Sequence, residues 1–162
     1  MQKQRYYTQR TSREGNFIYE EDYNLVSSLQ PLPQELTTHE ALDMAIEKWE
    51  FVLGLLVDSH LVDSHPNEPP SDGGVTSCPL CSKFYFKHHC AGCPVHEYTG
   101  QPQCCDTPYS EWLWVDQRRF KDNVTMGRVI AAKEIEFLKD VRAWWRAEGE
   151  QQHEAEKAAQ GS

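Results

Sequence analysis

All six cysteines of the 162-residue chain lie in one segment, between Cys78 and Cys105. Four of them form two C-x-x-C pairs separated by eight residues, and the remaining two are adjacent in the sequence. A C-x-x-C turn directs two thiolates toward one point, which is typical of a tetrahedral metal site. The segment therefore predicts a metal centre.

Zinc is the metal that this spacing favours. Zn²⁺ is held by four deprotonated ligands in a tetrahedron, and thiolates bind it at roughly 2.3 Å. Four thiolates leave no coordination position open for water, so the pattern indicates a structural site rather than a hydrolytic one. The expected ligands are Cys78, Cys81, Cys90 and Cys93, with Cys104 as the reserve ligand and Cys105 free or structural.

Three alternatives to this zinc site stay open. Cys93 is followed by Pro94, and bacterial iron–sulfur sequences also place a proline after a cysteine ligand, although the tight C-x2-C-x2-C run is absent. Histidine nitrogens are the second alternative, from His88, His89 or His96. Disulfides are the third, and a reducing cytosol disfavours them.

Signatures of catalysis are missing from the chain. It contains no H-x-E motif of a zinc deaminase, no H-E-x-x-H, no G-x-S-x-G and no phosphate-binding glycine loop. A tandem copy of Leu-Val-Asp-Ser-His over 56–65 holds two Asp-x-His units, but a five-residue step does not match the helical period. We interpret it as a duplication tolerated at a helix end. The sequence thus predicts a protein that is not an enzyme.

Charge is distributed unevenly along the chain, whose net charge is −9 with neutral histidines. Residues 31–76 contain nine acids against Lys48 alone, a local balance of −8, and no segment is dominated by basic residues. This disfavours general binding to nucleic-acid backbones. Two alternatives are kept: an acidic DNA mimic that inhibits a host defence enzyme, and a nucleic-acid-binding zinc module. The phosphate contacts of that module would be Lys83, Lys87, His88, His89, Arg118, Arg119 and Lys121.

The first long helix is expected over 37–65. Thr37 and Glu40 have the spacing of a capping box, and apolar residues then recur at three- and four-residue steps over 42–56. The charged residues assigned to the solvent side of this helix are Asp43, Glu47, Lys48 and Glu50.

Composition sets the remaining boundaries. An extended N-terminal arm over 1–36, with a short strand near 17–19, precedes the first helix. A loop rich in proline and glycine over 66–77 leads into the cysteine-rich metal module at 78–115. A second long helix is expected over 116–156, capped by Asp122 or Asn123, with a frayed tail at 157–162.

The second helix has an apolar face and a face of mixed charge, to which Glu134 is assigned. Two amphipathic helices that each expose an apolar stripe pack most simply on each other. The predicted fold is therefore mostly α: two long amphipathic helices packed as a hairpin, joined by a cysteine-rich zinc-binding module, with an extended N-terminal arm.

Aromatic side chains are the candidates for a partner-binding surface: Tyr6, Tyr7, Trp112, Trp114, Trp144 and Trp145. For Trp144 and Trp145, burial in the apolar face of the second helix is the favoured interpretation. We expect a protein partner, with nucleic acid as the alternative. Self-association through apolar helix surface left uncovered is a further outcome that the pattern allows.

Long apolar segments are absent from the sequence. It has no run of roughly 18 apolar residues, and its first residues lack the apolar segment of a signal peptide. We therefore expect a soluble protein that is neither exported nor bound to a membrane, and that works in a reducing compartment.

Several short stretches carry a resemblance that spans about 37–114. They are H-E-A-L at 39–42, A-I-E-K-W-E-F at 45–51, C-P-L-C at 78–81, C-A-G-C-P-V at 90–95, the Thr99-Gly100 turn, Cys104 and T-P-Y at 107–109. In these stretches the chain resembles small cysteine-rich metal-binding proteins of bacteriophages and prophages. The resemblance implies a metal centre and a phage accessory protein in the host bacterial cytoplasm, and it transfers no catalytic residue. The expected function is non-enzymatic zinc binding and macromolecular interaction that modulates a host process or defence.

Overall fold

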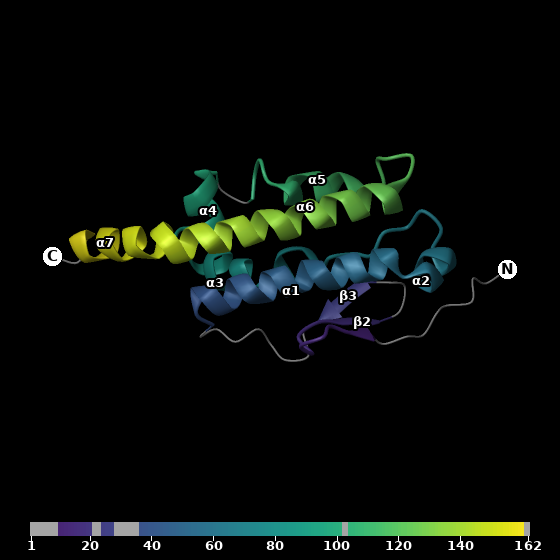
Figure 1. The fold of residues 1–162 in the computed structure, drawn as a ribbon, viewed down its shortest axis with the longest axis horizontal. Coiled ribbons are helices and arrows are strands. Elements are labelled where there is room, and N and C mark those ends of the chain that lie inside the picture. Colours follow the sequence, from purple (N-terminus) through teal and green to yellow (C-terminus); the bar gives the residue numbers. More distant parts are fainter. Residues whose placement is uncertain (1–9, 21–23, 28–35, 102–103, 161–162) are drawn as a thin grey trace.

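The computed structural model describes residues 10–20, 24–27, 36–101 and 104–160, most of them in helices (Figure 1). The predicted mostly α fold class is confirmed. The helices are α1 (Thr38–Val57), α2 (Ser59–Ser64), α3 (Pro79–His88), α4 (Pro94–Thr99), α5 (Pro108–Asp116), α6 (Asn123–Trp144) and α7 (Glu150–Gln160). The remaining elements are β1 (Arg10–Thr11), β2 (Ile18–Glu20), β3 (Asn24–Ser27), the 3-10 turn η1 (Gly74–Ser77) and the π-helical turn η2 (Trp145–Gly149).

Helix α1 begins at the predicted capping box. The backbone N–H of Glu40 donates to Thr37 Oγ1 at 3.1 Å, and the backbone N–H of Thr37 donates to Glu40 Oε1 at 3.2 Å. These bonds satisfy amides that the first turn of a helix leaves without partners. The apolar stripe that follows is buried, with Leu42, Val52 and Leu56 fully inaccessible.

The first helix is shorter than predicted, because it ends at Val57 instead of near residue 65. Asp58 has extended backbone dihedrals, and its side chain accepts from the backbone N–H groups of His60 and Leu61. An aspartate that bonds to nearby backbone amides caps a new helix instead of continuing the old one. The first copy of the duplicated segment therefore contributes the end of α1, and its aspartate starts α2.

The second long helix starts later and extends further than predicted. Asp122 accepts from the backbone N–H of Thr125 at 3.0 Å and so fixes the start of α6 at Asn123, whereas the segment just before it, 117–122, is not helical. Helical structure continues through η2 and α7 to Gln160, past the predicted end at 156. Among the described residues, no helix is long and apolar enough to cross a membrane.

Helices α1 and α6 lie side by side and run in opposite directions (Figure 1). Three contacts fix their register. Arg128 Nε donates to Leu56 O at 2.8 Å, Arg142 Nη1 lies 3.0 Å from Asp43 Oδ1, and His39 Nε2 lies 3.0 Å from Glu150 Oε2. As the residue number rises along α1, that of its partner falls. The pair thus forms the frame on which the shorter helices pack.

The N-terminal segment forms a small antiparallel sheet of order β1-β2-β3. Phe17, Tyr19 and Leu25 are buried in the main core, and Asn16 Nδ2 donates to Glu47 Oε2 of α1 at 2.6 Å. The described part of the predicted arm therefore packs on the helices. Tyr6 and Tyr7 lie outside the described residues.

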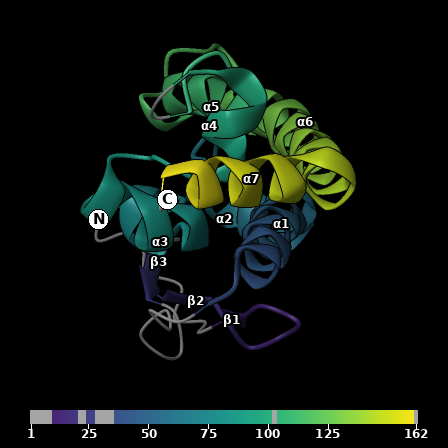
Figure 2. The same cartoon turned by 90° about the vertical axis from the view of Figure 1, so that its left-hand side faces the viewer.

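Viewed along the helix pair, α3, α4 and α5 complete a ring of helices with α1 and α6 (Figure 2). Helix α3 packs on α1, whereas α4 and α5 pack on α6. Trp112 of α5 is fully buried at the centre, and its ring meets that of Trp49 edge to face at 5.1 Å. The cysteine-rich segment is therefore built into the main core and is not an appendage at one end.

Candidate metal centre

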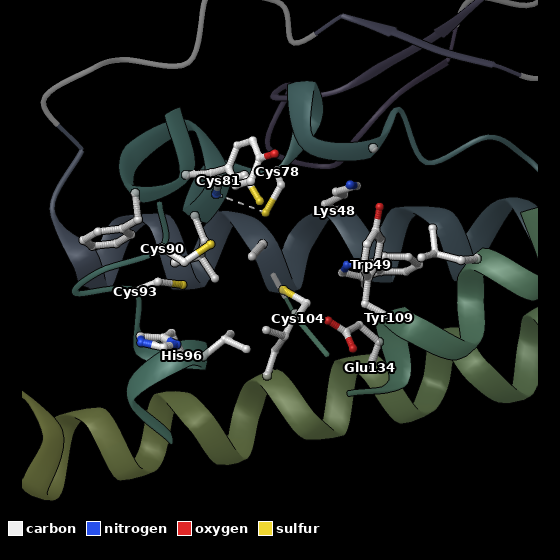
Figure 3. A pocket seen from close by; sticks show the side chains of 18 residues that line it. Lys48, Trp49, Cys78, Cys81, Cys90, Cys93, His96, Cys104, Tyr109 and Glu134 are labelled. Carbon is white, nitrogen blue, oxygen red and sulfur yellow. Dashed lines mark hydrogen bonds between the residues drawn. The ribbon is translucent and has the colours of Figure 1, made fainter. Parts of the chain in front are cut away.

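A cavity of about 260 Å³ lies among the helices of this ring (Figure 3). Part of its wall is apolar, formed by Ala45, Trp49, Leu80, Phe84, Val95, Leu113 and Leu138. The rest carries polar or ionisable groups, on Lys48, Cys78, Cys81, Tyr85, Cys90, Cys93, His96, Cys104, Tyr109 and Glu134. All five predicted cysteine ligands therefore line one cavity.

The first C-x-x-C pair stands at the start of α3. Cys78 is the N-cap, and its Sγ accepts from the backbone N–H of Cys81 at 3.4 Å, while Pro79 fits the first turn because it needs no amide partner there. A hydrogen bond from the Cys81 thiol lowers the pKa of Cys78 to about 6, with the charge of Lys48 acting in the same direction. The same bond and burial raise the pKa of Cys81. The pair therefore favours the thiolate at Cys78 and the thiol at Cys81.

The second C-x-x-C pair forms the turn between α3 and α4. Cys90 has a left-handed backbone with φ of 71°, and its N–H donates to Phe84 O at 3.0 Å. The N–H of Cys93 donates to Cys90 O at 3.0 Å, and Cys93 is the N-cap of α4. Both side chains are buried, and burial raises the pKa of Cys93 to about 12. This turn holds two further sulfurs at the cavity.

The last cysteine at the cavity is Cys104, which precedes α5. Its carbonyl accepts from Thr107 Oγ1 at 2.6 Å, so the cysteine is bonded to the residue that caps α5. Burial raises the pKa of Cys104, and nearby Cys78 and Cys93 act in the same direction. Cys105 is exposed and does not line the cavity. The two adjacent cysteines thus have different environments.

The sulfur atoms surround the cavity rather than meet at one point (Figure 3). In the part of the chain that the structure describes, no group of three or more cysteine, histidine, aspartate or glutamate side chains converges closely enough to hold a single metal ion. All six cysteines lie in that part and are free thiols, which does not support the disulfide alternative. Metal ligation by the five thiols therefore stays a prediction.

The predicted histidine alternatives have different positions. His96 lines the cavity, where its Nδ1 lies 3.1 Å from Gln101 O. His89 is the exposed C-cap of α3, and the side chain of His88 lies outside what the structure describes. His96 is thus the histidine that joins the cysteines at the cavity wall.

A buried ion pair also borders the cavity, and sequence analysis missed it. Lys48 Nζ lies 3.3 Å from Asp72 Oδ2, and the two side chains are only 3% and 5% exposed. The assignment of Lys48 to the solvent side of the first helix is wrong, because it lies three residues after Ala45 and four before Val52, on the buried stripe. That spacing was the signal that could have placed it.

Glu134 is the second buried charge that sequence analysis placed wrongly. It is 5% exposed, because it lies four residues from both Ile130 and Leu138 on the buried face of α6. Its carboxylate accepts from the backbone N–H of Tyr109, whereas Oε2 has no hydrogen-bond partner among the described residues. Burial raises the pKa of Glu134 to about 8, and the proximity of Cys78 adds to the shift while Lys48 opposes it.

Tyr109 lies beside both buried acids, Asp72 and Glu134. Its hydroxyl is hydrogen-bonded to Asp72, and burial together with that carboxylate raises the pKa of Tyr109. Its backbone N–H serves Glu134, so one residue of α5 contacts both acids. The cavity wall thus combines thiols from three chain segments with a polar group made by Lys48, Asp72, Tyr109 and Glu134. Thiols and a buried carboxylate are metal-ligating groups by type, although no three of the described ligating side chains converge at one point.

Comparison of the chain with protein-family models, with curated proteins and with solved structures finds no match.

Proposed function

We propose that the chain is a non-enzymatic zinc-binding protein in which a metal centre at the cysteine cavity holds the helices in place for binding a partner protein. The observation that carries this proposal is the gathering of five thiols, from three separated segments, around one cavity in the core. A metal bound there cross-links the start of α3, the α3–α4 turn and the segment before α5. Such a cross-link stabilises a fold because the unfolded chain has no preformed site.

The zinc ligands in this proposal are the two C-x-x-C pairs, with Cys104 in reserve. Zinc supplies no redox chemistry, and a set of four thiolates leaves no open position for a substrate. The role of the centre is therefore structural. The four ligand thiols must move closer together to share one ion, since they now line a cavity.

Helix α5 offers the exposed aromatic surface for a partner. Trp112 of this helix is fully buried, whereas Trp114 is 55% exposed and Leu113 is 41% exposed. Arg119 lies over the Trp114 ring at 5.8 Å, which adds a cation beside the aromatic face. Because Cys104 is bonded to the cap of α5, a metal at the cavity fixes the helix that presents Trp114. Trp145 is 3% exposed and belongs to the core, as the apolar face of the second helix led us to expect.

The proposed setting is phage infection in a bacterial cytoplasm, where the protein modulates a host process or defence. The resemblance of residues 37–114 to small cysteine-rich phage proteins supports this setting, and the partner is expected to be a host or phage protein. Aromatic side chains are enriched at such interfaces, which supports a protein partner.

Affinity capture from infected cells tests the partner half of this proposal. We expect wild-type protein to retain a partner that Trp114→Ala loses, since tryptophan is enriched among the few interface residues whose truncation costs about 2 kcal/mol or more. Val57→Ala is the matched control, because Val57 is 59% exposed but lies at the end of α1. Recovery of no protein at any salt concentration, or equal recovery by both variants, contradicts the assignment of this surface.

Nucleic-acid binding stays the alternative, but two of its predicted contacts have partners within the chain. Lys83 Nζ donates to Leu36 O at 2.7 Å, and Arg118 Nη2 lies 3.1 Å from Glu68 Oε1. A gel-shift assay at low salt tests the alternative directly, because phosphate contacts weaken steeply as salt rises. Absence of a shift rejects it.

The acidic DNA mimic is weakened by pairing of its acids. Within residues 31–76, Asp43, Asp58 and Asp72 each contact a basic side chain. Paired carboxylates present less negative field to a DNA-binding enzyme than free ones. This alternative therefore has no specific support from the arrangement of the charges.

A further inference from the structure

The two C-x-x-C pairs differ in how far they are open to solvent. Cys78 and Cys81 are partly exposed, whereas Cys90 and Cys93 are buried, each only 7% exposed. Oxidation of a cysteine requires that the oxidant reach its sulfur, so partly exposed thiols react before buried ones. The first pair is therefore the more accessible of the two.

The two thiols of the first pair are also hydrogen-bonded to each other. Cys78 is the N-cap of α3 and Cys81 is the third residue of the helix, the two positions whose side chains approach each other in a capping box. Cys78 Sγ accepts from the backbone N–H of Cys81 at 3.4 Å (Figure 3), and also from the Cys81 thiol. A disulfide needs Cα atoms about 4.4–6.8 Å apart, a spacing that one helical turn supplies. The two cysteines can therefore be joined without unfolding the helix.

These hydrogen bonds identify Cys78 as the attacking sulfur. A sulfur that accepts from an amide and from a thiol is stabilised as a thiolate, and the thiolate is the nucleophile in thiol–disulfide exchange. Cys81, which donates its thiol to Cys78, is in place to attack in the second step. The pair thus provides both sulfurs that a complete exchange reaction requires.

Oxidation of this pair removes two of the four proposed zinc ligands. Zinc is bound by deprotonated thiols, and the sulfurs of a disulfide are no longer thiolates. Cys90 and Cys93 are the ligands of the proposed set that remain. Metal binding and oxidation of the first pair therefore exclude each other.

We propose that Cys78 and Cys81 form a reversible disulfide on reaction with a low-molecular-weight disulfide such as glutathione disulfide, and that this oxidation releases the metal. The proposal rests on the metal centre of the proposed function and adds its regulation. It concerns a transient disulfide, the kind that a reducing compartment allows, and not a permanent structural cross-link.

The reaction consists of two exchange steps. The Cys78 thiolate attacks one sulfur of glutathione disulfide, whose S–S bond breaks and releases one glutathione thiolate. The Cys81 sulfur, after giving up its proton or its bond to the metal, attacks the Cys78 sulfur of the mixed disulfide and displaces the second glutathione thiolate. Both leaving thiolates take up protons. Two protein thiols are thus oxidised, one glutathione disulfide is reduced to two glutathiones, and the metal is released as the free ion.

Disulfide mapping of the full-length protein tests the proposal. Reduced protein with its bound zinc quantified is incubated with glutathione disulfide, alkylated and analysed by peptide mass spectrometry, while a chromogenic chelator follows released zinc. We expect a Cys78–Cys81 disulfide, alkylated Cys90 and Cys93, and about one zinc ion released for each disulfide. Reduction with dithiothreitol should restore the thiols and the binding of zinc.

Three results would contradict different parts of the proposal. A first disulfide between Cys90 and Cys93, or a Cys78–Cys81 pair that stays reduced, overturns the oxidation site. Complete oxidation of the pair with zinc retained overturns the release of metal. Protein that binds no metal even after incubation with zinc overturns the proposed function together with the release step, whereas the mapping still decides whether the pair is oxidised.

Two serine variants separate the roles of the cysteines. Cys81→Ser removes the second step, so glutathione should stay bound to Cys78, whereas wild-type protein displaces it. Cys105→Ser is the matched control, because Cys105 is exposed outside the cavity, and it should form the Cys78–Cys81 disulfide as wild type does. Absence of glutathione on Cys78 in Cys81→Ser overturns the assignment of the attacking sulfur. If Cys81→Ser does not fold, the wild-type mapping still decides the proposal.

Discussion

Removing one partner of the Lys48–Asp72 ion pair should destabilise the protein strongly. The two side chains are 3% and 5% exposed, and Nζ lies 3.3 Å from Oδ2. Lys48→Met leaves the Asp72 carboxylate buried without its cation, and such a loss costs about 3–5 kcal/mol. Domains are stable by only about 5–15 kcal/mol in total, so this one substitution removes a large share.

Urea unfolding followed by circular dichroism measures the effect. With a slope of about 2 kcal/mol per M, a loss of 3–5 kcal/mol lowers the unfolding midpoint by roughly 2 M. Lys133→Met is the matched control on α6. Its ammonium lies 3.8 Å from Glu111 Oε2 and both side chains are more than half exposed, so we expect a loss of at most about 1 kcal/mol.

A double variant separates the ion pair from the loss of lysine packing. In Lys48→Met/Asp72→Asn the side chain left at position 72 is neutral. We therefore expect the double variant to be more stable than Lys48→Met alone. Equal losses of unfolding free energy in Lys48→Met and Lys133→Met would refute the reasoning. They would mean that burial does not make the Lys48–Asp72 pair more important to stability than an exposed pair.

Two further predictions concern the helices. Gly149→Ala should cost about 1–3 kcal/mol in urea unfolding, because its new Cβ would lie 2.6 Å from the Trp144 ring, whereas Gly54→Ala, with open space around it, should gain about 1 kcal/mol from helix propensity. A loss in both variants contradicts this reading of the packing. Asp122→Ala should cost about 1 kcal/mol by removing the cap bond to Thr125, and unchanged stability would show that the cap is dispensable.

The two long helices were largely predictable because their signals are local, whereas α3, α4 and nearly all of α5 lie within the segment predicted as a cysteine-rich module. The capping box at Thr37 and the apolar stripe after it depend on residues within a few turns of each other. The break at Asp58 was missed because strong helix-breaking residues begin only at Pro66, and an apolar pattern does not report the cap bonds that Asp58 forms. Cap bonds therefore set the ends of the helices, whereas the apolar period predicts only that a long helix is present.

The candidate site was predictable in its thiols but not in its charges. The spacing of the five cysteines from Cys78 to Cys104 predicted that they belong to one site, and in the fold all five line one cavity. Lys48 and Glu134 were assigned to solvent from their residue type, although both occupy positions on buried stripes. Charged residues are rarely buried without partners, and the partner Asp72 lies in a loop that periodicity does not connect to α1.

The central claim is that the cysteine cavity is a metal centre that holds the fold together. The most direct measurement is far-UV circular dichroism and thermal melting of purified protein before and after chelation, with bound metal quantified at both stages. We expect metal in the purified protein, and its removal should unfold residues 78–109, lower the helical signal and lower the melting temperature. Unchanged helicity and melting after verified loss of metal would contradict the claim.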